Sequence, residues 1–152
     1  MTNPDGKLAK ILVGYYGFIQ TLHLIAIGRA TVLLGQTGAL SFPAPPPPGG
    51  WDEHARYFFV GVGAIDALNV LVALVFVYGF FTRAPWRGWV GTLTLTVSLY
   101  SAILFAFATT PTGAWTYRPV EYLVIVLAYL PVAVLVVLFA AWLVTGRIDP
   151  DR

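Results

Sequence analysis

The sequence predicts an all-α fold: an integral membrane bundle of four transmembrane helices, with both termini in the cytoplasm. Composition and patterning both support this prediction. Of the 152 residues, 58% are hydrophobic and only 11% are charged, whereas a soluble domain has about 25% charged residues. Four apolar runs, at 11–34, 57–81, 89–109 and 120–144, each reach the roughly 20 residues that cross a bilayer as a helix. We therefore predict a single transmembrane domain.

The first run, 11–34, follows Lys7 and Lys10, as the apolar core of a signal peptide would. It is longer than such a core, and no clear small-x-small cleavage site ends it. We therefore expect a retained helix. The outer loop that follows, 36–56, contains four consecutive prolines, which favour a stiff polyproline II conformation. This loop is either a spacer across the outer end of the bundle or a docking strand for a partner protein.

The second and third runs are joined by the tight turn RAPWRG at 83–88, which makes them antiparallel neighbours. The fourth run contains Pro131. Proline has no backbone N–H to donate, so it frees the carbonyl of Leu127 one turn earlier. We expect the third and fourth runs to present almost entirely apolar faces, which suits contact with lipid or with a large partner.

Basic residues near the ends of the runs predict the orientation. One side of the membrane carries six of them: Lys7, Lys10, Arg83, Arg87, Arg147 and Arg152. The other side carries Arg56 and Arg118. The positive-inside rule therefore places both termini and the 82–88 loop in the cytoplasm, and we expect a prokaryotic inner membrane. Because the basic residues mark topology, no nucleic-acid partner is expected.

Asp66 lies inside the second run, where an ionised carboxylate costs about 2.5–3.5 kcal/mol at the helix centre. Counted from the expected outer helix ends, at about 1.5 Å per residue, Asp66, His23 and Ser98 all lie about 18 Å deep. Helical spacing adds three polar side chains on the faces of His23 and Asp66. This cluster either fixes the packing of the helices or forms a site for protons, a quinone or another lipophilic ligand. Its predicted members are His23, Asp66, Asn69, Ser98, Gln20 and Tyr16.

Arg29 is a second charged residue inside an apolar run, in the outer half of the first one. A charge at such a depth usually finds a partner. We expect an ion pair with Glu121 at the outer rim of the bundle. The alternative is a site for an anion or a lipid headgroup.

Few residues are suited to hold a cofactor. The chain has no cysteine and two histidines, His23 and His54, which differ in depth by about 18 Å. A transmembrane haem b usually needs two histidines at matched depth, so we expect no internal bis-His haem. We also expect no protein-only metal site and no covalently bound cofactor. No nucleophile–base pair is visible in the spacing, so we assign no catalytic residue and do not expect an enzyme that acts alone.

The segment GAIDALNVLVALVFVYGFFTR, residues 63–83, is similar to the second helix of the DoxX-like four-helix integral membrane family. The resemblance covers the middle third of the chain, and the C-terminal GRIDPDR is similar to the ending of that family. It implies a small membrane subunit of a redox complex, of the kind linked to quinone reduction. The matching positions are Gly63, Asp66, Gly79, Thr82 and Arg83.

These observations lead to three hypotheses about function. The first is a non-catalytic small subunit that gives structural support to a larger redox or electron-transfer complex, with other integral membrane subunits and lipids as partners. The second is a redox component that binds a quinone or another lipophilic ligand through His23 and Asp66. The third is a small proton-coupled transporter or channel that uses the same cluster.

Overall fold

The structure, a computed structural model, describes residues 3–148, in which all regular elements are helices. Four spans in this part of the chain are long and apolar enough to cross a membrane. The predicted all-α architecture with four such helices is therefore confirmed. The long helices are α1 (Lys7–Thr37), α2 (Glu53–Phe81), α3 (Arg87–Thr109), α5 (Pro119–Ala128) and α6 (Leu130–Val144), and the short η1 (Thr110–Thr112) and α4 (Ala114–Tyr117) lie between α3 and α5.

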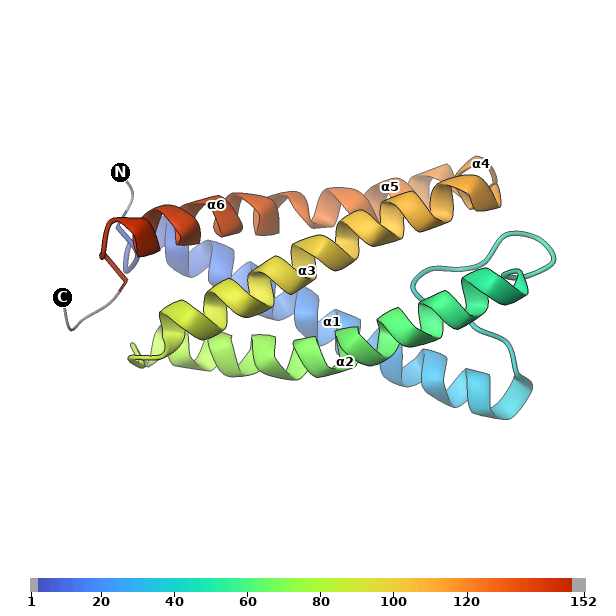
Figure 1. Ribbon diagram of the computed structural model, residues 1–152, viewed down its shortest axis with the longest axis horizontal. Coiled ribbons are helices and arrows are strands. Elements are labelled where there is room, and N and C mark those ends of the chain that lie inside the picture. Colours follow the sequence, from blue (N-terminus) through green and yellow to red (C-terminus); the bar gives the residue numbers. More distant parts are fainter. Residues whose placement is uncertain (1–2, 149–152) are drawn as a thin grey trace.

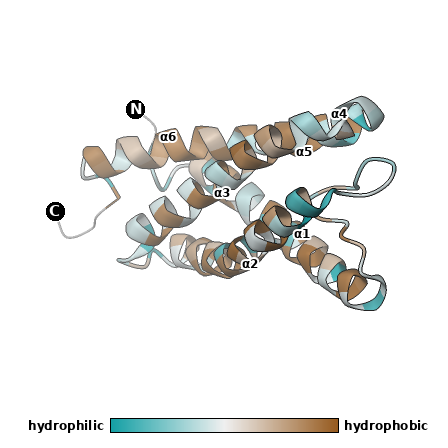
Figure 2. Cartoon of the chain, turned by 45° about the vertical axis from the view of Figure 1, so that its right-hand side comes forward, coloured by the Kyte–Doolittle hydropathy of each residue, from teal (hydrophilic) through white to brown (hydrophobic). Residues whose placement is uncertain are grey.

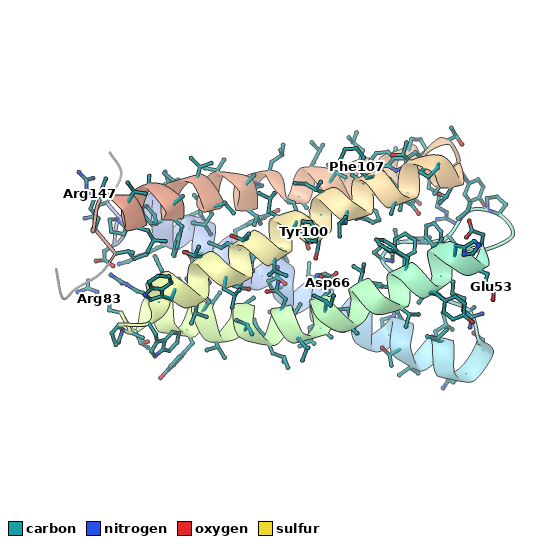
Figure 3. All side chains as sticks on the ribbon, in the orientation of Figure 1. Glu53, Asp66, Arg83, Tyr100, Phe107 and Arg147 are labelled. Atoms are coloured by element: carbon teal, nitrogen blue, oxygen red, sulfur yellow. The ribbon has the colours of Figure 1, made fainter. Side chains whose placement is uncertain are left out.

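The helices run back and forth along the long axis of the molecule (Figure 1). α1 packs against α2, α2 against α3, and α6 closes the bundle against both α3 and α1. The start of α1, the end of α6 and the turn between α2 and α3 lie at the same end, here named the inner end (Figure 1). Arg83 and Arg147 also lie there (Figure 3). This arrangement fits the predicted orientation, although the cytoplasmic side itself stays a prediction and Arg152 lies outside the described residues.

The long helices consist largely of hydrophobic residues (Figure 2), and many of these residues are exposed. Leu68 on α2, Phe107 on α3 and Val137 on α6 each expose more than two thirds of their surface, at 69%, 76% and 68%. Apolar surface of this extent would make a soluble monomer associate. It is the surface expected of helices in lipid, where all backbone hydrogen bonds are made within the helix.

A close approach of α3 to α2 and α6 organises the inner half of the core. Phe76 and Phe139 lie edge to face with ring centroids 5.2 Å apart. A Cβ atom at Gly91 would lie 2.5 Å from ring carbons of both phenylalanines. The glycine therefore lets the aromatic pair pack against the α3 backbone, as small residues do between membrane helices.

An ion pair closes the inner end. The Arg87 guanidinium donates to the Asp5 carboxylate at 2.9 Å and lies over the Phe80 ring, 5.8 Å from its centroid. Arg87 is buried, whereas Asp5 is partly exposed. The segment before α1 is thereby tied to the start of α3.

The proline-rich loop closes the outer end. Its Phe42 and Ala44 are buried among helix residues, including Phe59 of α2 for the former and Tyr122 of α5 for the latter. The Tyr122 hydroxyl also donates to the Pro45 carbonyl at 2.9 Å. The loop thus lies across the bundle, as in the spacer interpretation, and it contributes side chains to the core.

The fourth span is interrupted at Tyr129, between α5 and α6. Pro131 stands in the first turn of α6, where the missing proline N–H costs least. The carbonyl of Ala128 accepts a hydrogen bond from the Tyr15 hydroxyl at 2.8 Å. From the sequence we expected Pro131 to free the carbonyl of Leu127. In the structure, the carbonyl that accepts a hydrogen bond from a side chain is that of the next residue, Ala128.

The close approach at Gly91 predicts a large effect of one methyl group. Gly91→Ala should lower the free energy of unfolding by about 1–3 kcal/mol, because the new methyl group would force the buried rings of Phe76 and Phe139 to shift. Gly61→Ala on α2 is the matched control, since no atom lies within 4 Å of its Cβ position. Titration with a denaturing detergent in bicelles measures both. Equal stability of the two variants would contradict the close approach.

Candidate functional site

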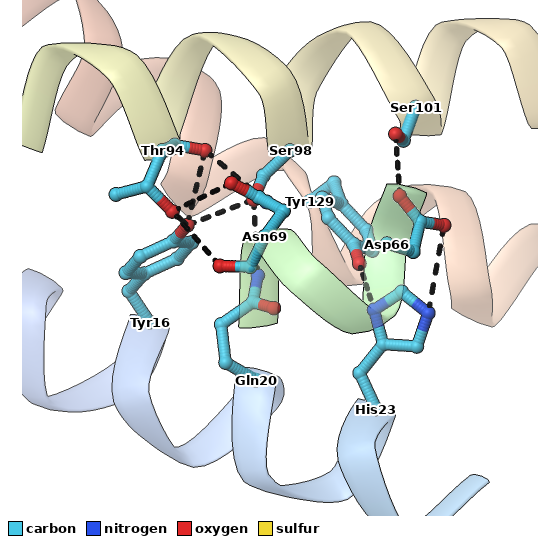
Figure 4. Close-up of polar contacts among 9 residues, drawn as sticks. All are labelled: Tyr16, Gln20, His23, Asp66, Asn69, Thr94, Ser98, Ser101 and Tyr129. Atoms are coloured by element: carbon cyan, nitrogen blue, oxygen red, sulfur yellow. Dashed lines mark hydrogen bonds and ion pairs between the residues drawn. The ribbon is translucent and has the colours of Figure 1, made fainter. Parts of the chain in front are cut away.

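Polar side chains form two groups inside the bundle (Figure 4). The group nearer the inner end is named the amide–hydroxyl network, and its members are Tyr16, Gln20, Asn69, Thr94 and Ser98. The other group is named the His23 cluster, and its members are His23, Asp66, Ser101 and Tyr129.

The amide–hydroxyl network joins α1, α2 and α3. The Tyr16 hydroxyl lies 2.9 Å from Thr94 Oγ1 and 2.8 Å from Ser98 Oγ. Ser98 Oγ also accepts from Gln20 Nε2 at 3.1 Å and from Asn69 Nδ2 at 2.9 Å. Every member is buried. Neutral polar groups that bond across helices in this way fix the register of membrane helices.

The His23 cluster joins α1, α2, α3 and the α5–α6 junction. His23 Nε2 lies 3.8 Å from Asp66 Oδ2. The other Asp66 oxygen accepts from the Ser101 hydroxyl at 2.7 Å. On the other side of the imidazole, the Tyr129 hydroxyl lies 3.4 Å from His23 Nδ1. Polar contacts therefore run without a break from Tyr129 through His23 and Asp66 to Ser101. They include the histidine and the carboxylate of the predicted cluster.

The six residues predicted to form one cluster are therefore divided between two groups. His23 and Asp66 stay together, whereas Ser98 contacts Asn69 instead of Asp66. The serine that binds Asp66 is Ser101, one helical turn further along α3. Counting residues from helix ends places a side chain only to within about one turn, or about 5.4 Å, so it could not separate the two serines.

A cavity of about 310 Å³ borders the His23 cluster. All four cluster residues line it at one place, and most of the other lining residues are apolar, among them Leu22, Phe105 and Ile125. Pro43 of the outer loop lines it as well. A volume of this size with apolar walls and a few convergent polar groups is typical of a small-molecule site.

The cavity lies where α1 and α5 separate. From the middle of the molecule toward the outer end, α1 diverges from α5 (Figure 1). Leu22 of α1, on the cavity wall, is 47% exposed, and Ile125 on the opposite wall is half-buried. In a bilayer this side of the cavity would face the lipid chains.

The cluster combines several chemical abilities. The hydroxyls of Ser101 and Tyr129 are hydrogen-bond donors, and the Asp66 carboxylate is an acceptor. Imidazole can give up or take a proton, and a neighbouring carboxylate orients the ring. Phe42 stacks on the His23 ring, with centroids 5.6 Å apart, and holds its plane. The site can therefore bind a carbonyl or hydroxyl group and exchange protons with it.

Sequence reasoning missed Thr94, Ser101 and Tyr129 as site residues. The third run was expected to be almost entirely apolar, and the structure corrects this, because α3 contributes to both polar groups. Thr94, Ser98 and Ser101 follow the i, i+4, i+7 spacing of one helix face. The same test that grouped Tyr16, Gln20 and His23 would have found them.

The expected ion pair between Arg29 and Glu121 is wrong. Glu121 accepts from Arg118, three residues earlier, at 2.9 Å. Arg29 instead lines a separate cavity beside the outer loop. The local pair forms because Arg118 stands directly before α5, and Glu121 lies in its first turn.

Within residues 3–148, no group of three or more His, Asp or Glu side chains is placed to hold a metal ion.

Comparison of the chain with models of protein families, with curated proteins and with solved structures gave no match. The resemblance of residues 63–83 to the DoxX-like family therefore stays a prediction.

The amide–hydroxyl network predicts a structural role for the Tyr16 hydroxyl. Tyr16→Phe should lower the free energy of unfolding by about 0.6–1.7 kcal/mol, the range found for polar contacts between membrane helices, because Thr94 and Ser98 each lose a partner. Tyr100→Phe is the control, since Tyr100 is exposed on α3. Detergent titration in bicelles measures the difference, and equal stability of the two variants would count against the network.

Proposed function

We propose that this chain binds a quinone-class lipophilic molecule within the membrane, as a small subunit of a larger redox complex. The observation that carries the proposal is the cavity of about 310 Å³, which has largely apolar walls and ends on the His23 cluster. Its lipid-facing side would let a membrane-soluble ligand enter without crossing water. The expected setting is a prokaryotic inner membrane with both chain termini in the cytoplasm.

A quinone suits the chemistry of this cavity. Its ring oxygens accept hydrogen bonds, and Tyr129 and His23, which both line the cavity, carry groups that can donate them. The flat ring would lie against apolar walls that include Phe105, and its isoprenoid tail would leave between α1 and α5. The resemblance of residues 63–83 to DoxX-like proteins points to the same ligand class.

The His23–Asp66 pair suits the proton chemistry of a quinone. Reduction to the quinol adds two electrons and two protons to the ring oxygens. His23 could pass one proton toward a ring oxygen through Tyr129, whose hydroxyl lies 3.4 Å from Nδ1, while Asp66 lies 3.8 Å from Nε2 and orients the imidazole. The electrons and the second proton would come from another subunit of the complex, so the chain would hold the ring and supply one proton without carrying out the whole reaction alone.

The other two hypotheses receive less support from the geometry. A subunit that gave only structural support would need the amide–hydroxyl network but no cavity beside an ionisable pair. A transporter or channel would need a polar path to both membrane surfaces. Between the His23 cluster and the inner end lies the amide–hydroxyl network, whose side chains are buried and hydrogen-bonded to one another. These side chains would block a polar path from the cluster to the inner membrane surface.

Substitutions in the His23 cluster should remove the bound quinone. Asp66→Asn and His23→Phe should each reduce the quinone retained per chain at least about tenfold, since a hydrogen bond that involves a charged group contributes about 1.5–3 kcal/mol. Tyr16→Phe, which alters only the network, should retain it. The measurement is extraction and chromatography of quinones from protein purified in mild detergent. Unchanged quinone content in both cluster variants would contradict the proposal.

The subunit part of the proposal has its own test. The native particle, purified in mild detergent from its own membrane, should be far larger than the 16.5 kDa of one chain and should contain partner proteins in fixed ratio. Light scattering and mass spectrometry give its mass and content. A small particle that carries only quinone or lipid would contradict the subunit role and leave the binding role intact.

A further inference from the structure

Arg29 is placed in an unusual position for a cation. It stands on the exposed side of α1, eight residues before the helix ends at Thr37, which is about 12 Å along the helix axis. The side chain is long enough to reach from this depth toward the membrane surface. A cation in this zone is costly unless an anion accompanies it.

The acidic residues of the outer end do not provide that anion. Glu121 is bound to Arg118 at 2.9 Å, Asp52 caps α2 by accepting from the Ala55 backbone N–H at 2.8 Å, and the exposed Glu53 at the start of α2 forms no ion pair with Arg29. The ion pairs found among residues 3–148 do not include Arg29. The guanidinium of Arg29 is therefore available to bind an anionic ligand.

Arg29 lines a large, open cavity. The cavity measures about 780 Å³ and lies between the second half of α1 and the proline-rich loop. Its polar lining residues, Arg29 and Gln36 of α1 and Ser41 of the loop, all carry hydrogen-bond donors, and no acidic residue lines it. Val32 and Leu33 give it an apolar wall on the side that would face lipid chains. The cavity thus combines an anion site with a surface for acyl chains.

We propose that this cavity binds the phosphate of an anionic phospholipid from the outer leaflet, with Arg29 as the main ligand and Gln36 and Ser41 as further donors. A guanidinium binds two phosphate oxygens at once, which makes arginine the preferred partner of such groups. The lack of an acidic lining residue favours a headgroup with net negative charge over a zwitterionic one. The acyl chains would lie along Val32 and Leu33.

This site is distinct from the quinone cavity but adjacent to it, because Ala26 lines both. A phospholipid at Arg29 would lie beside the region where α1 and α5 separate. The proposal does not depend on the identity of the ligand at His23, and its test uses lipid content alone.

The test counts phospholipid retained by the full chain. Protein exchanged into vesicles of phosphatidylcholine with a minor fraction of phosphatidylglycerol is extracted in mild detergent and examined by native mass spectrometry. We expect phosphatidylglycerol to be enriched on the wild-type chain, and Arg29→Gln to reduce this enrichment at least about tenfold, as the loss of a charge-assisted bidentate contact would. Arg56→Gln is the matched control, because Arg56 is also an exposed outer-end arginine.

Two outcomes would overturn the proposal. One is equal phosphatidylglycerol retention in Arg29→Gln, Arg56→Gln and wild type. The other is displacement of the lipid by millimolar inorganic phosphate, which would assign the site to a free anion. A free energy of unfolding of Arg29→Gln equal to that of the wild type, measured by detergent titration in bicelles, would show that the variant is folded, so a loss of phosphatidylglycerol in that variant supports the lipid site.

Discussion

A polar side chain inside the hydrocarbon of a bilayer must find its hydrogen-bond partners within the protein, because water is absent there. This constraint explains the arrangement of the bundle interior. Tyr16, Asn69 and Ser98 satisfy one another across three helices, and the contacts hold those helices in one register. The His23 cluster lies beside this fixed part of the bundle. Its ionisable pair is held by neighbours, yet it borders a cavity where a ligand could take over some of the same hydrogen bonds.

The interruption of the fourth span shows the same constraint acting on the backbone. A helix break within a membrane exposes a carbonyl, and here the Tyr15 hydroxyl binds that of Ala128. Tyr129, at the break itself, brings a hydroxyl to His23. The break therefore contributes a polar group to the site without leaving the Ala128 carbonyl unbound.

Several charged residues have a partner of opposite charge within the fold, whereas Arg29 has none among the described residues. Arg87 and Arg118 each have a carboxylate partner, and these pairs lie at opposite ends of the molecule. Asp66 and His23 lie 3.8 Å apart within the span. Arg29 has a cavity rather than a carboxylate beside it. The two proposed ligands follow from this division: a quinone at the ionisable pair and an anionic phospholipid at the unpaired cation.

The sequence by itself determined the four spans, their antiparallel order and the residues whose polarity demanded a partner. These properties are local, because hydropathy and turn chemistry depend on residues near one another in the chain. Only the tertiary structure decided which polar groups meet. The choice between Ser98 and Ser101 as the partner of Asp66 depends on the rotation and axial shift of α3, which follow from packing such as that at Gly91. The partner of Glu121 and the burial of Phe42 depend likewise on how α5 and the outer loop settle on the bundle. Spacing along one helix cannot specify its rotation against another.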